Sequence, residues 1–301
     1  MNKSFTLIEI LVIIVVIGIL SAFILVGMSS ITDSANIAKG KAFDNSLRNS
    51  LLMNLISEWK LDGGTIGSSA GVSDVIDSWG TNNATNIYTP PGPLVKGGTD
   101  CVSGKCLSFD GTNDYINCGN GISLNFGANN FTLSLWVKTA IAPSTPGVAV
   151  LSKTGGTNYW IFYITRDTSY TEFYFYVPPA PADRQLFSNA YDKIGDGKWH
   201  LVTLVENYGV NGILYIDGKY HATSTTIFTS LDDAASSFYI STATYNGSLD
   251  EIRVYKAALS QTQIQNNYFV GLNNLYKNKG ITLNEFNQRI VELKTNLVKN
   301  E

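Results

Sequence analysis

The chain has 301 residues, of which 21 are Lys or Arg and 24 are Asp or Glu, so its formal net charge is −3. Proteins that hold nucleic acid by its phosphates present clustered basic side chains, and no basic run stands out in this sequence. We therefore expect no nucleic-acid partner. Three cysteines and two histidines are also too few to predict a Cys/His metal site of the zinc type.

The first feature along the chain is an apolar run that begins at residue 5 and reads FTLIEILVIIVVIGILSAFILVGM. It is long enough to cross a bilayer as a helix, and Glu9 is its one charged residue. A carboxylate at that depth is costly and suggests a specific partner. Two alternatives fit less well, because a secretory signal has a shorter apolar core and a plain membrane anchor does not need Glu9.

The start of this run, Phe-Thr-Leu-Ile-Glu, resembles the N-terminus of type IV prepilins and of the pseudopilins of type II secretion systems. The resemblance implies that residues 1–4 are a leader, which a prepilin peptidase removes by cutting between Ser4 and Phe5. The family usually has Gly where this chain has Ser4. A further implication is a single-pass membrane protein that later joins other pilin or pseudopilin subunits, at the cell surface or in the periplasm.

Glu9 lies about one helical turn after Phe5. After cleavage, its carboxylate could pair with the new amine of Phe5 in the same subunit or in an adjacent one. The resemblance implies that the second pairing sets the register of subunits in a filament. The alternative is a carboxylate that reaches water near the lipid headgroups.

An apolar stripe continues beyond this run. Phe43, Leu47, Leu51 and Leu55 recur at intervals of four residues, as expected for one face of a helix. No proline interrupts this stretch. The sequence therefore predicts one transmembrane and stalk helix over residues 5–57.

The composition changes after residue 61, where Gly, Asn, Thr, Ser and Tyr replace the long aliphatic runs. Alternating apolar and polar residues predict strands at 131–139, 199–205 and 212–216. The Asp-Gly pair that follows the last of these is a strong signal for a two-residue hairpin. Several short strands with turns between them predict an all-β sandwich over residues 58–260.

The order of these pieces resembles the laminin-G-like, concanavalin-like jelly roll. The resembling segments are 58–62, 77–84, 107–115, 131–136, 197–202, 214–218 and 247–255. Relatives of this sandwich often bind calcium, and the resemblance implies Asp77, Asn82 and Asp250 as ligands. The alternative is that Asp77 caps a turn and Asp250 pairs with a basic neighbour. The predicted fold is mainly β, with a long N-terminal helix and a helical tail over 261–301.

The three cysteines lie close together in the sequence. Ser103-Gly104 lets the chain reverse between Cys101 and Cys106, so a disulfide could close this small loop. A compartment outside the cytoplasm would permit it. Cys118 would then be left over, as a buried rather than a reactive thiol.

Catalysis finds little support in the sequence. His200 holds a framework position of the resembled fold, and we expect His221, just after the hairpin, to be exposed. Glycosidases on related folds use two carboxylates, but no strand here carries two on one face. We expect the protein not to be an enzyme.

Aromatic residues suggest a binding surface. Over residues 170–176 they alternate, so that Tyr174 and Tyr176 share one side of a strand and Phe173 and Phe175 share the other. If the Phe pair faces the core, the Tyr pair is exposed, and exposed tyrosines suit glycans or protein surfaces. The alternative is a cross-strand aromatic ladder that only stabilises the sheet.

The tail carries two helix signals. Ser260 is placed to cap a first helix, and Thr282 with Glu285 makes a capping-box pattern before a second. Taken together, the sequence predicts a pilin-like subunit, minor or at the tip, that displays a sandwich for adhesion to glycans or surface proteins. The alternatives are a secretion pseudopilin and an anchored carbohydrate-binding protein that never polymerises.

Overall fold

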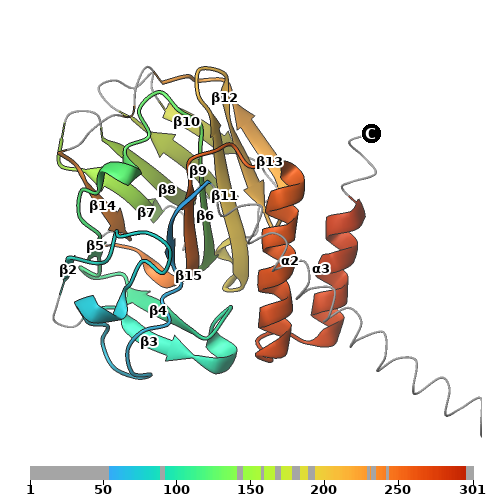
Figure 1. Ribbon diagram of the computed structural model, residues 1–301. Coiled ribbons are helices and arrows are strands. Elements are labelled where there is room, and N and C mark those ends of the chain that lie inside the picture. The colour runs from blue at the N-terminus through green and yellow to red at the C-terminus, as the bar shows by residue number, and fades with distance from the viewer. Residues whose placement is uncertain are drawn as a thin grey trace, which may run out of the picture.

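The computed structural model describes residues 54–88, 92–140, 145–156, 159–166, 171–177, 184–188, 194–228, 231, 235–241 and 244–295. In this part of the chain two antiparallel sheets pack face to face, and two helices lie beside one of them (Figure 1). The arrangement is a β-sandwich of the jelly-roll type, as predicted.

The eight-stranded sheet contains the strands that lie next to the helices. Its order is β13 (Lys219–Ser224), β12 (Asn211–Ile216), β11 (Trp199–Asn207), β6 (Phe131–Lys138), β15 (Asn246–Tyr255), β4 (Lys105–Asp110) and β3 (Leu94–Gly97), with β1 (Leu55–Trp59) also paired to β15.

The seven-stranded sheet forms the other layer. Its order is β10 (Arg184–Ser188), β9 (Thr171–Tyr176), β8 (Trp160–Arg166), β7 (Thr145–Thr154), β14 (Ser237–Ile240), β5 (Ile116–Asn117) and β2 (Asn86–Ile87). Four short 3-10 helices lie in the connections: η1 (Val72–Asp74), η2 (Gly98–Asp100), η3 (Ile122–Leu124) and η4 (Ile194–Asp196).

The main core lies between the two sheets, because alternate side chains of each strand point inward. Trp59 of the eight-stranded sheet stacks on Phe238 of the seven-stranded sheet, with ring centroids 5.1 Å apart. Phe126 and Phe131 stack at 4.0 Å. All four side chains are fully buried, and the contact between Trp59 and Phe238 joins the two layers.

The predicted strands and hairpin are confirmed. β6, β11 and β12 coincide with the three alternating segments, within one or two residues at their ends. Between β12 and β13, Asp217 has φ 51° and Gly218 has φ 74°. Positive φ at both central positions is what a type I′ hairpin turn requires.

The predicted stalk helix is wrong where the structure tests it. Residues 55–57 belong to β1, where Leu55 lies opposite Tyr255 of β15. Pairing with β15 satisfies the backbone of β1 and carries Trp59 into the core. Residues 1–53, which include Ser4, Phe5 and Glu9, lie outside the described part of the chain. None of the helices that the structure describes is long and apolar enough to cross a membrane.

The two tail helices are confirmed as α2 (Gln261–Lys277) and α3 (Leu283–Thr295). Ser260 caps α2, because its Oγ accepts a hydrogen bond from the backbone N–H of Gln263 at 3.3 Å. The Oγ1 of Thr282 accepts one from the backbone N–H of Glu285 at 3.2 Å. Both starts follow the capping pattern read from the sequence.

These helices cover part of the outer face of the eight-stranded sheet (Figure 1). Trp136 points outward from β6 and stacks on Tyr268 of α2, with centroids 5.6 Å apart. Leu201 of β11 and Leu272 of α2 join the same buried cluster. Gly271 allows this close approach, because a Cβ added there would overlap the indole of Trp136.

The contact at Gly271 gives a test of helix docking. Gly to Ala within an exposed helix stabilises a protein by about 1 kcal/mol, but Gly271→Ala should cost about 1–3 kcal/mol because the added methyl overpacks against Trp136. Urea unfolding of the variant measures this. Thr262→Ala, at an exposed position of the same helix, is the control and should not destabilise. A neutral or stabilising Gly271→Ala would contradict the packing.

Candidate functional site

The outer face of the seven-stranded sheet is paved with tyrosines. Phe173 and Phe175 of β9 are fully buried in the core, so the alternation predicted from the sequence is confirmed. Tyr174 and Tyr176, between and after them, lie on the opposite face and are partly exposed.

Tyr174 lies across the sheet. Its ring stacks on that of Tyr163 from β8, with centroids 4.6 Å apart and planes 25° from parallel. A Cβ added at Gly147 of β7 would overlap the Tyr174 hydroxyl, so the side chain reaches as far as that strand. Tyr159 and Tyr176 pack beside this pair, with centroids 6.2 Å apart. We call these four tyrosines the β8–β9 group.

A second set of tyrosines lies on the same face, toward β2. Tyr115 contacts Tyr88 at 5.5 Å and Tyr239 at 5.9 Å between ring centroids. The Nδ2 of Asn117 donates to the hydroxyl of Tyr239 at 3.4 Å. We call Tyr88, Tyr115 and Tyr239 the β5–β14 group.

Sequence reasoning missed this second group and half of the first. Tyr115, Asn117 and Tyr239 alternate with buried Ile116 and Phe238, which is a signal for an outward position. It is a weak signal, because β2 and β5 are only two residues long, and only tertiary pairing brings Tyr88, Tyr115 and Tyr239 together.

Tyr163 provides a neutral phenol on the tyrosine face. Burial raises the pKa of Tyr163 to about 12, and the neighbouring phenols of Tyr174, Tyr159 and Tyr176 add to the shift.

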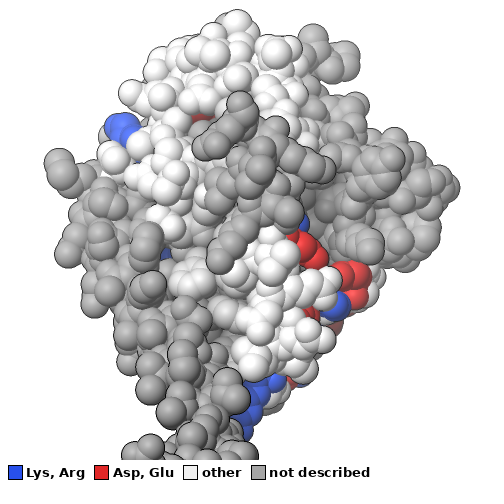
Figure 2. All heavy atoms as spheres, turned by 90° about the vertical axis from the view of Figure 1, so that its right-hand side faces the viewer, with Lys and Arg blue, Asp and Glu red and all other residues white. Residues whose placement is uncertain are grey.

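A different face is seen in Figure 2, where most described residues are uncharged and acidic and basic side chains gather in small mixed groups. No extended basic patch appears among the described residues there.

Comparison with known proteins identifies the family of this chain. A family model described as the concanavalin A-like lectin/glucanases superfamily matches residues 110–265. The chain belongs to this superfamily. A comparison with curated proteins found no match.

Several solved structures share the lectin-like fold. The binding domain of Paraclostridial Mosquitocidal Protein 1 has a TM-score of 0.55 at 16% identity over 74% of this chain and 53% of that one. The botulinum neurotoxin serotype G binding domain has a TM-score of 0.55 at 15% identity over 73% and 51%. This chain thus spans about half the length of those two toxin domains.

An enzyme-associated domain shares the fold over nearly its whole length. Domain 4 of AbnA, an extracellular arabinanase from Geobacillus stearothermophilus solved with arabinotriose, has a TM-score of 0.53 at 17% identity. The match covers 70% of this chain and 97% of that domain. At such identities the likeness shows the fold alone.

Two of the three predicted calcium ligands lie together in the lectin-like sandwich. The Oδ1 of Asp77 accepts hydrogen bonds from the backbone N–H groups of Glu58, Trp79 and Gly80, and its Oδ2 accepts from that of Asn82. The Asn82 side chain donates to two serine hydroxyls. Asp77 therefore caps a turn, which is the alternative that the sequence left open.

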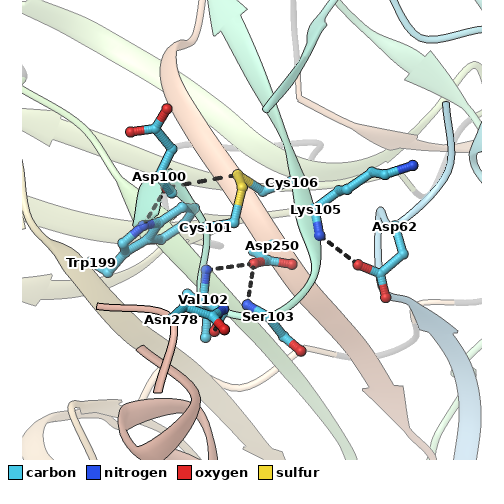
Figure 3. The surroundings of a disulfide bond; sticks show 10 residues. All are labelled: Asp62, Asp100, Cys101, Val102, Ser103, Lys105, Cys106, Trp199, Asp250 and Asn278. Carbon is cyan, nitrogen blue, oxygen red and sulfur yellow. Dashed lines mark hydrogen bonds between the residues drawn. A yellow bond between two sulfur atoms is a disulfide. The ribbon is translucent and has the colours of Figure 1, made fainter. Parts of the chain in front are cut away.

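The third predicted ligand, Asp250, supports the disulfide loop (Figure 3). Its Oδ2 accepts hydrogen bonds from the backbone N–H groups of Val102 and Ser103, at 2.8 and 3.1 Å. Burial raises its pKa well above the usual range. Among described residues, no three or more His, Cys, Asp or Glu are placed to hold a metal ion. Calcium stays a prediction.

The predicted disulfide is confirmed. Cys101 and Cys106 are joined by an S–S bond of 2.04 Å, and the loop they close packs under α2 with Trp199, whose indole N–H donates to the carbonyl of Asp100 (Figure 3). Cys118 is buried. Burial raises the pKa of its thiol, and the nearby Asp77 carboxylate adds to this shift, so the reactive thiolate is disfavoured.

Both histidines contact other residues of the sandwich. The expectation that His221 is exposed is wrong: its ring contacts the core residue Phe173 at 6.4 Å, and burial lowers its pKa to about 4. His200 lies between two carboxylates, with Nδ1 2.8 Å from Asp217 Oδ2 and Nε2 3.1 Å from Asp196 Oδ1. The His221 ring thus turns toward the core, and the His200 ring lies between Asp217 and Asp196. The absence of catalysis stays a prediction.

His200 predicts a pH dependence of stability. Burial disfavours the imidazolium, but Asp217 and Asp196 outweigh it and raise the His200 pKa from 6.5 to about 9, while Arg289 faces Asp217. A raised folded-state pKa gives stability that is fully present below pH 6.5 and is lost as pH rises through about 9. Urea unfolding across this window should show that fall, and His200→Asn should flatten it. An equal slope in both proteins would contradict the assignment.

Proposed function

We propose that the sandwich binds carbohydrate on its tyrosine face, and that the N-terminal segment mounts it on a pilin-type filament. One observation supports the carbohydrate binding. Helices cover part of the outer face of the eight-stranded sheet, while the outer face of the seven-stranded sheet presents seven partly exposed tyrosines. Tyrosine offers a flat apolar ring with a polar tip, which suits the apolar faces and the hydroxyls of sugars.

The orientation of the Tyr174 ring suits ligand binding better than packing in a core. Tyr174 lies over Tyr163 and Gly147 instead of standing upright, so one face of its ring can meet a ligand. A rigid aromatic loses little side-chain entropy on binding. The relative solved with arabinotriose makes carbohydrate the first ligand class to test, and a surface protein is the second.

The second part of the proposal, assembly into a pilin-type filament, rests on the sequence. A membrane-length apolar run that carries only Glu9 five residues into the mature segment has a pilin-type explanation, in which Glu9 pairs with the amine of Phe5 on an adjacent subunit. Prepilin peptidase, the membrane and other subunits are then the partners. A secretion pseudopilin and a non-polymerising anchored lectin are the rivals.

Binding through the tyrosine face is tested by Tyr174→Ala. The full chain in detergent is assayed on immobilised arabinan and a panel of other neutral polysaccharides, and the variant should bind its ligand at least about fivefold more weakly, about 1 kcal/mol. Tyr220→Ala is the matched control, because Tyr220 is 51% exposed but lies on the eight-stranded sheet. Unchanged binding by Tyr174→Ala would leave the tyrosines as a purely stabilising ladder.

The filament half is tested on the protein from its native host. The mature chain should begin at Phe5, with a methylated amine by resemblance to pilins, and N-terminal mass spectrometry decides this. Glu9→Gln should be processed normally but fail to enter filaments, because the carboxylate that pairs with the adjacent amine is gone. A chain that still begins at Met1 would favour the anchored lectin.

A further inference from the structure

The two tyrosine groups form one surface. We infer that this face takes a linear polymeric glycan lying across the strands, with contacts to both the β8–β9 group and the β5–β14 group. The inference rests on the proposed carbohydrate binding and specifies its ligand as an extended chain rather than a terminal sugar.

Strand register aligns the groups. Tyr176 of β9 lies opposite Ile161 of β8, Ile161 opposite Ser152 of β7, and Ser152 opposite Tyr239 of β14. From Tyr239 the row continues to Asn117 of β5, which lies opposite Asn86 of β2. One unbroken row therefore crosses six neighbouring strands of the sheet.

The length of this row argues against a single sugar. Neighbouring strands are about 4.8 Å apart, so five steps from β9 to β2 span about 24 Å. Tyr176 and Tyr239 lie three of these steps, or about 14 Å, apart, so a single sugar ring cannot contact both. A chain of several sugars running along the row can contact Tyr176 and Tyr239 at once.

In the middle of the row, the outward side chains on β7 are small. On β7, between the two groups, the outward positions include Gly147, Ala149, Ser152 and Thr154. Ala149 is 2% and Ser152 1% exposed, so neighbouring atoms cover both of these small side chains. A chain could thus pass from one aromatic platform to the other without meeting a large side chain on the strand between them.

The far end of the row is polar. Asn117 and Asn86 follow Tyr239, and the Asn117 amide already orients the Tyr239 hydroxyl. Amide and phenol groups donate and accept hydrogen bonds, as sugar hydroxyls require. The row therefore combines aromatic platforms with hydrogen-bonding groups along its length.

Affinity as a function of chain length tests this inference. Linear arabino-oligosaccharides, with cello-oligosaccharides as a second series, are titrated into the full chain in detergent by calorimetry, from the disaccharide upward. Two linked contacts bind more tightly than either alone, so affinity should rise at least about tenfold along the series that binds. Equal affinity for short and long members would overturn the extended-chain inference and leave carbohydrate binding intact.

Three variants separate the two tyrosine groups. Tyr239→Ala should remove most of the gain with length and change disaccharide affinity less than twofold, whereas Tyr174→Ala should weaken short and long members alike. Tyr88→Ala, at a 40% exposed position, repeats the Tyr239 test with less risk to folding. Full retention of the gain in both β5–β14 variants would overturn the inference. No binding to any glycan, in these series or on the panel, would remove the proposed function and the inference with it.

Discussion

The packing of α2 on Trp136 decides which side of the sandwich is available. A sandwich has two outer faces, and each strand presents alternate side chains to one of them. On the eight-stranded sheet the outward side chains include Trp136 and Leu201, which are too apolar to leave in water and are buried by α2. Gly271 makes the approach close enough. Among the described residues, no helix covers the outer face of the seven-stranded sheet, where the outward residues include tyrosines, which tolerate water.

Buried polar groups also lie on the eight-stranded side of the sandwich. The disulfide loop rests on Asp250, and the network of His200, Asp217 and Arg289 lies under the helices. These groups fix loops and helices on the eight-stranded side. They leave the tyrosine face without a titrating histidine among its described side chains, and the phenol of Tyr163, whose pKa burial raises to about 12, stays neutral. Ligand binding at these rings should depend on ring shape and hydroxyl placement.

Local patterns predicted much of this fold. Alternation placed Phe173 inside and Tyr174 outside, Asp217-Gly218 marked the hairpin, and Ser260 marked the start of α2, because each depends on a few neighbouring residues. Features set by distant pairing were not predicted. The β5–β14 group assembles from the short strands β2, β5 and β14, which lie far apart in sequence, and His221 turns toward Phe173. At Leu55, the last position of the predicted helical stripe, pairing with β15 gives a strand instead, since a tertiary ladder outweighs local periodicity.

The central claim is that the tyrosine face is where ligand binds. The most direct measurement is an NMR titration of the ring-labelled tyrosines, with the best-binding glycan added to the full chain in detergent. The account predicts shifts for the seven face tyrosines and none for Tyr245, Tyr255 and Tyr268, which are buried away from the seven tyrosines of that face. Binding without shifts on the face, or with shifts confined to other tyrosines, would contradict it.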